Sequence, residues 1–175
     1  MDLTSTKLLI KKVPNYPCKG ILFYDLTPIF SNPSAFSSVL NKMEWTIGDV
    51  KNVKIASPES RGFIIGSALA DRMKLPFIPI RKKGKLPRKT FDITYKTEYS
   101  KDTLSIHKDS IEPGDGVILV DDVMATGGTL KACSELIEKA GGEVLRVLII
   151  ARISSLWEMA IFNLAKYGYE SIFVL

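Results

Sequence analysis

Residues 117–129 read Val117-Ile118-Leu119-Val120-Asp121-Asp122-Val123-Met124-Ala125-Thr126-Gly127-Gly128-Thr129, and they carry the strongest structural signal in the chain. The first four residues form a continuous apolar run, which is typical of a strand buried on both faces of a parallel sheet. Two adjacent acids follow this run, and a loop of small residues then opens into a helical pattern. In open α/β sheets, ligands bind at the carboxyl ends of such strands.

The loop of residues 125–129 has the chemistry of a phosphate-binding site. Gly127 and Gly128 allow the backbone to approach a ligand closely, and Thr126 and Thr129 offer hydroxyl groups. The free N–H groups and the dipole of the helix that follows attract an anion. The spacing alone leaves one alternative open, which is a solvated strand end followed by a tight helix cap.

The paired acids Asp121 and Asp122 narrow the kind of ligand. Two adjacent carboxylates at a strand end suit two vicinal hydroxyl groups, or a cation that is held near a phosphate. The loop is not a Walker P-loop, because no lysine directly follows its glycines.

Strands and helices alternate on both sides of this stretch. Strands are predicted at 53–56, 77–81, 117–120, 144–151 and 171–175, and helices near 3–12, 33–45, 61–73, 128–140 and 155–167. Residues 90–99 and 103–107 alternate in polarity as the strands of a hairpin do. The alternation predicts an α/β fold in which helices flank a central, mostly parallel sheet.

Composition limits the class of protein. With 175 residues, 46% of them hydrophobic, the chain has room for one domain with an apolar core. Lys and Arg number 24 and Asp and Glu 19, so the net charge is 24 − 19 = +5, which favours an anionic partner. Two cysteines and one histidine are too few for a disulfide framework or a structural zinc site. No apolar run approaches the roughly 20 residues of a membrane span, and the first residues lack a secretory signal, so we expect a cytoplasmic location.

The strand, the acid pair and the loop resemble the phosphoribosyl diphosphate (PRPP) motif of the type I phosphoribosyltransferases. Further segments, in the same order along the chain, resemble the adenine phosphoribosyltransferases of that family. They are the N-terminal segment 13–28, the pyrophosphate loop Ala56-Ser57-Pro58-Glu59-Ser60-Arg61-Gly62-Phe63, the basic loop Arg81-Lys82-Lys83-Gly84-Lys85-Leu86-Pro87, and the flap residues 97–99 and 104–109. The match runs from about Val13 to Ala151, whereas the last 20 or so residues match poorly.

The resemblance implies a type I phosphoribosyltransferase fold in a single domain, 1–175. Its parts would be a small N-terminal hood at about 1–32, a core at about 33–175 and a β-flap at about 88–108. It also implies the reaction of PRPP with adenine to give AMP and pyrophosphate in purine salvage. Mg²⁺ would bind through substrate oxygens and water, without a direct protein ligand, and the protein would be a homodimer.

The family's site residues carry over to matching positions of this chain. Those that the resemblance places against PRPP are Ser60, Arg61, Arg81, Lys82, Lys85, Tyr99, Asp121, Asp122, Ala125, Thr126, Gly127, Gly128 and Thr129. The catalytic residues would be Glu98, Arg61, Asp121 and Asp122. Glu98 would assist proton transfer at the purine ring nitrogens, and the acid pair would face the positive charge that builds on the ribose. The resemblance also implies a cis peptide bond between Glu59 and Ser60.

The adenine base would be held by Leu22, Phe23 and Tyr24. Phe23 would stack on the base, while the carbonyl of Leu22 and the N–H of Tyr24 would read its amino and ring-nitrogen edge. A 6-oxo purine presents the opposite donor and acceptor pattern, so this arrangement would reject it. Tyr24 stands where the family usually has arginine, and Ser57-Pro58 replaces a glycine followed by an apolar residue.

Two other functions stay open at this point. One is the same transfer to another base, and the Tyr24 difference keeps it in view. The other is a PRPP-sensing regulator that binds nucleic acid, which the basic run of residues 81–89 allows. No aromatic residue is interleaved in that run before Phe91, and a sensor has no use for Glu98, so nucleic acid is the less favoured partner. From the residues alone, Arg61 could also be an ordinary exposed arginine at the start of a helix. Glu98 could likewise be a carboxylate on the protein surface.

Overall fold

The computed structural model describes residues 1–96 and 101–175 of the chain. These residues form two compact units, Met1–Gly48 and Asp49–Leu175. The boundary differs from the expected one, because residues 33–48 belong to the N-terminal unit and not to the core unit. Each unit is described by itself below.

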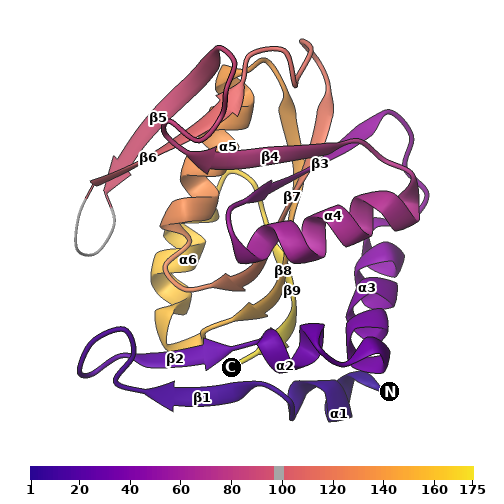
Figure 1. Ribbon diagram of the computed structural model, residues 1–175, viewed down its shortest axis with the longest axis vertical. Helices are drawn as coiled ribbons and strands as arrows, with labels where there is room; N and C mark the ends of the chain where they lie inside the picture. Colours follow the sequence, from indigo (N-terminus) through magenta and orange to yellow (C-terminus); the bar gives the residue numbers. More distant parts are fainter. Residues whose placement is uncertain (97–100) are drawn as a thin grey trace. The chain divides into compact units, whose positions relative to one another are not determined.

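A seven-stranded sheet forms the second unit (Figure 1). The strands are β3 (Val53–Pro58), β4 (Phe77–Lys82), β5 (Thr90–Lys96), β6 (Lys101–His107), β7 (Gly116–Met124), β8 (Glu143–Arg152) and β9 (Glu170–Val174). Their order is β5-β6-β4-β3-β7-β8-β9. Strands β4, β3, β7, β8 and β9 run parallel, and the antiparallel hairpin of β5 and β6 extends the sheet beyond β4. The predicted mostly parallel sheet is confirmed.

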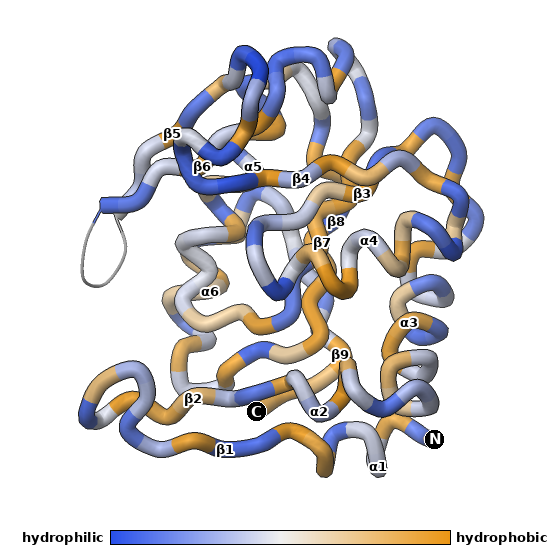
Figure 2. The backbone as a smooth tube through the Cα atoms, in the orientation of Figure 1, coloured by the Kyte–Doolittle hydropathy of each residue, from blue (hydrophilic) through white to orange (hydrophobic). Residues whose placement is uncertain are grey.

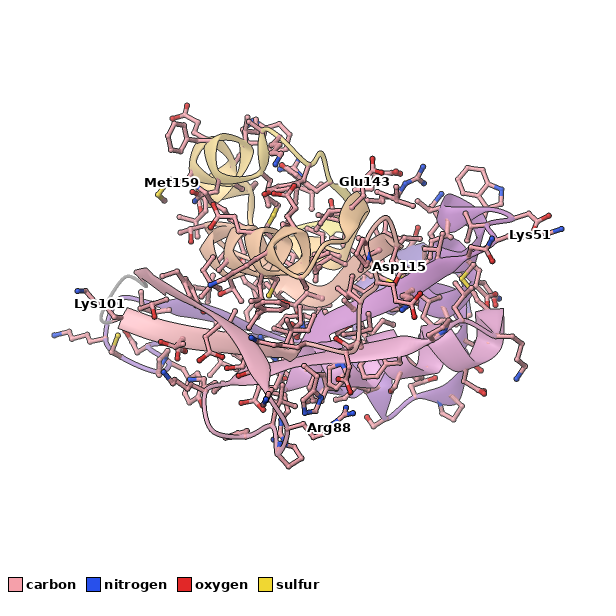
Figure 3. The ribbon with its side chains drawn as sticks, turned by 90° about the horizontal axis from the view of Figure 1, so that it is seen from above. Lys51, Arg88, Lys101, Asp115, Glu143 and Met159 are labelled. Atoms are coloured by element: carbon pink, nitrogen blue, oxygen red, sulfur yellow. The ribbon has the colours of Figure 1, made fainter. Side chains whose placement is uncertain are left out.

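Helices cover both faces of this sheet. Helix α4 (Arg61–Met73) lies on one face, and α5 (Gly128–Lys139) and α6 (Trp157–Leu164) lie on the other (Figures 1 and 3). A short 3-10 turn, η1 (Ser154–Leu156), precedes α6. None of the described helices is long and apolar enough to cross a lipid bilayer.

The central strands are apolar because they lie between these two helical layers. Figure 2 shows β3, β7 and β8 as largely hydrophobic segments. Residues 117–120 of β7 and 147–151 of β8 are all buried. Strand β7 continues past the predicted end at Val120 to Met124, because β8 pairs with it as far as Met124 and Arg152. The acid pair is therefore part of the strand, near its carboxyl end.

Helix α4 packs closely on β3 at Gly66. A Cβ atom on Gly66 would overlap with the Ser57 hydroxyl and would lie 3.0 Å from the ring of Phe77. Ser57 itself is fully buried. Ser57, which stands where the family usually has glycine, therefore fills the space next to Gly66. The serine fits there because the residue that faces it on α4 has no side chain.

The N-terminal unit contains α1 (Leu3–Lys7), β1 (Lys11–Pro14), β2 (Leu22–Asp25), α2 (Thr27–Phe30) and α3 (Pro33–Ile47). Asn32 caps α3 by accepting a hydrogen bond from the N–H of Ala35 at 3.1 Å, as its place before Pro33 predicts. The predicted helix over 3–12 is wrong beyond Lys7. Residues 11–14 form a strand instead, because they pair with β2 in an antiparallel ribbon.

Candidate active site

A pocket of about 350 Å³ opens at the carboxyl ends of β3 and β7. These strands are neighbours, but β3 leads through α4 to β4 on one side, and β7 leads through α5 to β8 on the other. Open α/β sheets bind ligands at such a reversal of strand order. The lining residues are Pro58, Glu59, Ser60, Arg61, Asp121, Asp122, Val123, Met124, Ala125, Thr126, Gly127, Gly128, Thr129 and Leu130.

The acid pair forms one wall of the pocket. Asp121 Oδ1 accepts a hydrogen bond from the N–H of Asp122 at 2.9 Å, and Asp122 Oδ1 accepts one from the N–H of Val123 at 2.8 Å. The other oxygen of Asp122, Oδ2, lies 2.9 Å from Nε of Arg61. Asp122 is only 2% exposed, whereas the side chain of Arg61 is one-third exposed, so water reaches this ion pair only from the arginine side. The structure thus joins three of the four predicted catalytic residues.

Burial sets the electrostatics of the pair. It raises the pKa of Asp121 well above its ordinary value, and the neighbouring charge of Asp122 raises that pKa further. Burial also raises the pKa of Asp122, although the positive charge of Arg61 opposes the rise. Two carboxyl groups in this setting are stabilised by anything that brings hydrogen-bond donors or positive charge.

The loop of residues 125–129 joins β7 to α5. Gly127 adopts the left-handed conformation, with φ of 79°, which a glycine accommodates without strain. No side chain caps the N-terminus of α5 among the described residues, so its first-turn N–H groups are available to an anion. All five predicted phosphate-binding residues of this loop line the pocket.

Two residues that sequence reasoning missed contact this loop. Tyr95 on β5 has its hydroxyl 3.2 Å from Oγ1 of Thr129, and Asn163 on α6 donates from Nδ2 to the carbonyl of Thr126 at 2.8 Å. They lie 34 and 37 residues from their partners. Neither belongs to a local motif, so nothing in the sequence marks them.

The segment between β3 and α4 forms another part of the pocket lining. The peptide bond between Glu59 and Ser60 is cis, which confirms the expectation from the resemblance. Helix α4 begins at Arg61, directly after this bond, and directs the arginine toward the acid pair. Ser60 and Arg61 both line the pocket, as predicted.

The three predicted cations of the basic loop are each paired with a carboxylate. Arg81 Nε and Lys85 Nζ lie 2.8 and 3.4 Å from the carboxylate of Glu59, and Lys82 Nζ lies 2.9 Å from Oδ2 of Asp102. None of these three cations is among the lining residues. Glu59 lines the pocket and connects the side chains of Arg81 and Lys85 to it, although sequence reasoning gave Glu59 no role.

A substitution tests this connection. Burial alone would raise the pKa of Glu59, but hydrogen bonds from Arg81 and from the N–H of Lys82, together with Lys85, outweigh it and hold the pKa below its ordinary value. The stability that Glu59 contributes is therefore present above the unfolded-state pKa, about 4.3, and is lost as pH falls through the folded-state value. We expect Glu59→Gln to lower the free energy of unfolding at pH 7 by about 1–3 kcal/mol.

Urea unfolding at pH 7 and at acid pH measures the effect. The Glu59→Gln variant should lose less stability than the wild type when the pH is lowered, because the titrating group is gone. The exposed Glu143→Gln variant is the matched control. An unchanged acid dependence in Glu59→Gln would contradict the argument.

The remaining predicted residues are not among the described residues that line the pocket. Glu98 and Tyr99 fall outside the described residues. Leu22, Phe23 and Tyr24 form most of β2 in the N-terminal unit. There Phe23 packs edge-to-face on Tyr16, with ring centroids 5.0 Å apart.

Known proteins share both the sequence and the fold. Residues 26–163 match the family model of the phosphoribosyl transferase domain. The chain is 45% identical to the adenine phosphoribosyltransferase of Pseudothermotoga lettingae over 156 residues, which are 89% of this chain and 90% of that one. The solved adenine phosphoribosyltransferase of Thermoanaerobacter pseudethanolicus has a TM-score of 0.94 at 37% identity, with 99% of both chains covered. That of Saccharomyces cerevisiae, in complex with adenine and an imino-altritol bisphosphate, has a TM-score of 0.90 at 36% identity, with 97% of both chains covered.

Proposed function

This chain belongs to the phosphoribosyltransferase family, and we infer that it transfers the phosphoribosyl group of PRPP to adenine, giving AMP and pyrophosphate in purine salvage. It is a pentosyltransferase, like the adenine phosphoribosyltransferases that it matches over most of its length. The observation that carries the inference is one pocket that joins an anion-binding loop, an acid pair of which Asp122 is buried, and an arginine. A 5′-phosphate, two ribose hydroxyls and a diphosphate need these three features.

We propose that the loop of residues 125–129 binds the 5′-phosphate of PRPP through backbone N–H groups and hydroxyls. Asp121 and Asp122 would accept hydrogen bonds from the 2′ and 3′ hydroxyls of the ribose. As the bond from C1 to pyrophosphate breaks and the bond from C1 to adenine forms, positive charge develops on the ribose ring. The same carboxylates would stabilise that charge in a buried setting, where electrostatic interactions are strong.

The leaving pyrophosphate would lie beside Ser60 and Arg61. Arg61 is already paired with Asp122. This ion pair supports a role in which the arginine and the acid together position the pyrophosphate and the ribose on either side of the bond that breaks. Further positive charge would come from Arg81, Lys82 and Lys85, which are not themselves among the residues that line the pocket. Their partners in the structure are the carboxylates of Glu59 and Asp102.

The side chains of the site fit a Mg²⁺ ion that is bound mainly by PRPP and enters the pocket with it. Among residues 1–96 and 101–175, no three His, Cys, Asp or Glu side chains are grouped as metal ligands. The buried oxygen of Asp122 that faces Arg61 is also committed to that ion pair. The ion would therefore bind diphosphate and ribose oxygens and water, as Mg²⁺ commonly does. When bound, it supplies positive charge to the leaving diphosphate.

The backbone of β2 supports the proposed reading of adenine. Alternate residues of a strand direct their N–H and C=O groups to the same edge, so the carbonyl of Leu22 and the N–H of Tyr24 share one edge of β2. One acceptor and one donor at this spacing match the amino group and ring nitrogen of adenine. Phe23 would stack on the ring, and the proposal needs only the backbone of Tyr24, whose side chain differs from the family's.

Purine-base turnover with PRPP and Mg²⁺ tests the proposal. We expect release of pyrophosphate with adenine but not with hypoxanthine or guanine. Glu98→Ala should lower kcat by about 10²–10⁴-fold, because it removes acid–base assistance at the purine ring. Glu143→Ala, an exposed acid, should turn over adenine as the wild type does.

Two other outcomes would identify the alternatives. Turnover of a 6-oxo purine would keep the phosphate site and contradict the assignment of Leu22, Phe23 and Tyr24 to adenine. Binding of PRPP without turnover of any base would favour a PRPP-sensing regulator.

We also propose a homodimer in the cytoplasm, on the strength of the family resemblance. Sedimentation velocity at micromolar concentration should then give the mass of two chains. A single-chain mass across the concentration range would contradict the dimer.

A further inference from the structure

Helix α6 packs against the phosphate loop with one face. Ala160 and Leu164 are each 1% exposed. A Cβ atom on Gly127 would lie 3.5 Å from Ala160 Cα, from Asn163 Cβ and from Leu164 Cγ. Positions 160, 163 and 164 share a helix face, because they are three and four residues apart. The loop at Gly127 therefore rests directly on α6.

Asn163 makes the polar contact on this face. Its Nδ2 donates a hydrogen bond to the carbonyl oxygen of Thr126 at 2.8 Å. That carbonyl belongs to the peptide unit that joins Thr126 to Gly127, and both residues line the pocket. The contact thus holds the backbone of the loop itself, not a side chain.

The planarity of the peptide unit gives this contact a consequence in the pocket. In a trans peptide, the carbonyl of one residue and the N–H of the next point in opposite directions. Asn163 holds the Thr126 carbonyl toward α6, so the N–H of Gly127 points away from the helix. Since Gly127 has no Cβ and a φ of 79°, this unit meets little steric resistance to rotation. A rotated unit would present a carbonyl oxygen to the phosphate.

We propose that Asn163 is a positioning residue that locks this peptide unit, so that the N–H of Gly127 donates to the 5′-phosphate of the substrate. The proposal rests on the proposed function for the identity of the phosphate. It also gives a role to a residue of α6, which the sequence analysis did not assign to the site. Asn163 contacts the loop and is not among the residues that line the pocket, so its effect should fall on phosphate binding.

Ribose 5-phosphate tests the proposal, because it carries the phosphate and requires no turnover. Asn163→Leu removes the donor at similar volume and favours a helix. We expect its Kd for ribose 5-phosphate in calorimetry, and its KM for PRPP, to rise about tenfold. Its kcat and its KM for adenine should stay within about twofold of the wild type, which loss of folded protein alone would not produce. Met159→Gln, at an exposed position one turn before Asn163 on the same helix (Figure 3), should bind as the wild type does.

Two further variants keep the test decisive. Asn163→Gln retains an amide donor and should recover most of the affinity. Asn163→Ser removes the amide without adding apolar surface, and it replaces the Leu variant if that variant does not fold. Wild-type affinity for ribose 5-phosphate in a folded Leu or Ser variant would overturn the proposal, and so would equal weakening by Met159→Gln. The wild type could also bind ribose 5-phosphate and yet turn over no adenine. If Asn163→Leu then loses the binding of ribose 5-phosphate, the positioning role is supported and the proposed function is overturned.

Discussion

Asp121→Asn should yield a more stable protein with little activity. The substitution keeps the shape of the side chain and removes one of the two carboxylates that would face the positively charged transition state. We expect kcat with adenine and PRPP to fall by about 10²–10³-fold, the range for loss of one preorganised electrostatic contact. Steady-state kinetics with Asp71→Asn, an exposed acid on α4, as the control measures this loss.

The stability of the same variant should move in the opposite direction. Burial and the charge of Asp122 raise the pKa of Asp121, so the folded protein binds this proton more tightly than the unfolded chain does. The stability linked to Asp121 is thus present below the unfolded-state pKa, about 3.9, and is lost as pH rises through the folded-state value. Asp121→Asn should raise the Tm at neutral pH by about 2–4 °C for each kcal/mol regained.

Thermal unfolding at a series of pH values separates this account from a general effect of the substitution. The gain in Tm should shrink toward acid pH, where Asp121 of the wild type is protonated. A gain in Tm that is equal at all pH values, or a lower Tm at neutral pH, would contradict this account. Either result would show that the negative charge of Asp121 does not lower the stability of the folded protein.

Gly66→Ala should cost stability even though alanine is the better helix former. Its Cβ would overlap with the hydroxyl of Ser57 and press on Phe77. Overpacking of a tight core costs about 1–3 kcal/mol, which exceeds the gain of about 1 kcal/mol in helix propensity at most such sites. Urea unfolding should therefore show a net loss, and α4 should shift relative to the pocket wall that it supports.

The double variant Ser57→Gly with Gly66→Ala is the informative partner. It removes the overlapping hydroxyl, which is buried and has no hydrogen-bond partner among the described residues. We expect the double variant to be more stable than Gly66→Ala alone, with a coupling energy of about 1 kcal/mol or more. Additive effects of the two substitutions in the cycle would contradict direct contact between positions 57 and 66.

Local patterns in the amino-acid sequence were enough to predict the fold class and the centre of the site. The apolar run from Val117, the acids at its end and the glycine loop obey local rules, since a buried strand, a helix start and an anion site each have a characteristic pattern. For this reason the parallel sheet and the acid pair could be predicted before any coordinates. The predicted helix over 3–12 was wrong in its second half because the pairing of β1 with β2 is not local, and periodicity cannot detect it.

The side chains that surround that centre are brought there by long-range packing. Glu59 meets Arg81 across 22 residues, and Asn163 meets Thr126 across 37. Such contacts depend on how α6 packs on the sheet and on how β4 pairs with β3 within it, and no local pattern encodes their partners. The buried setting that raises the pKa of Asp121 has the same origin, since the sequence places two acids side by side but only packing removes water from them.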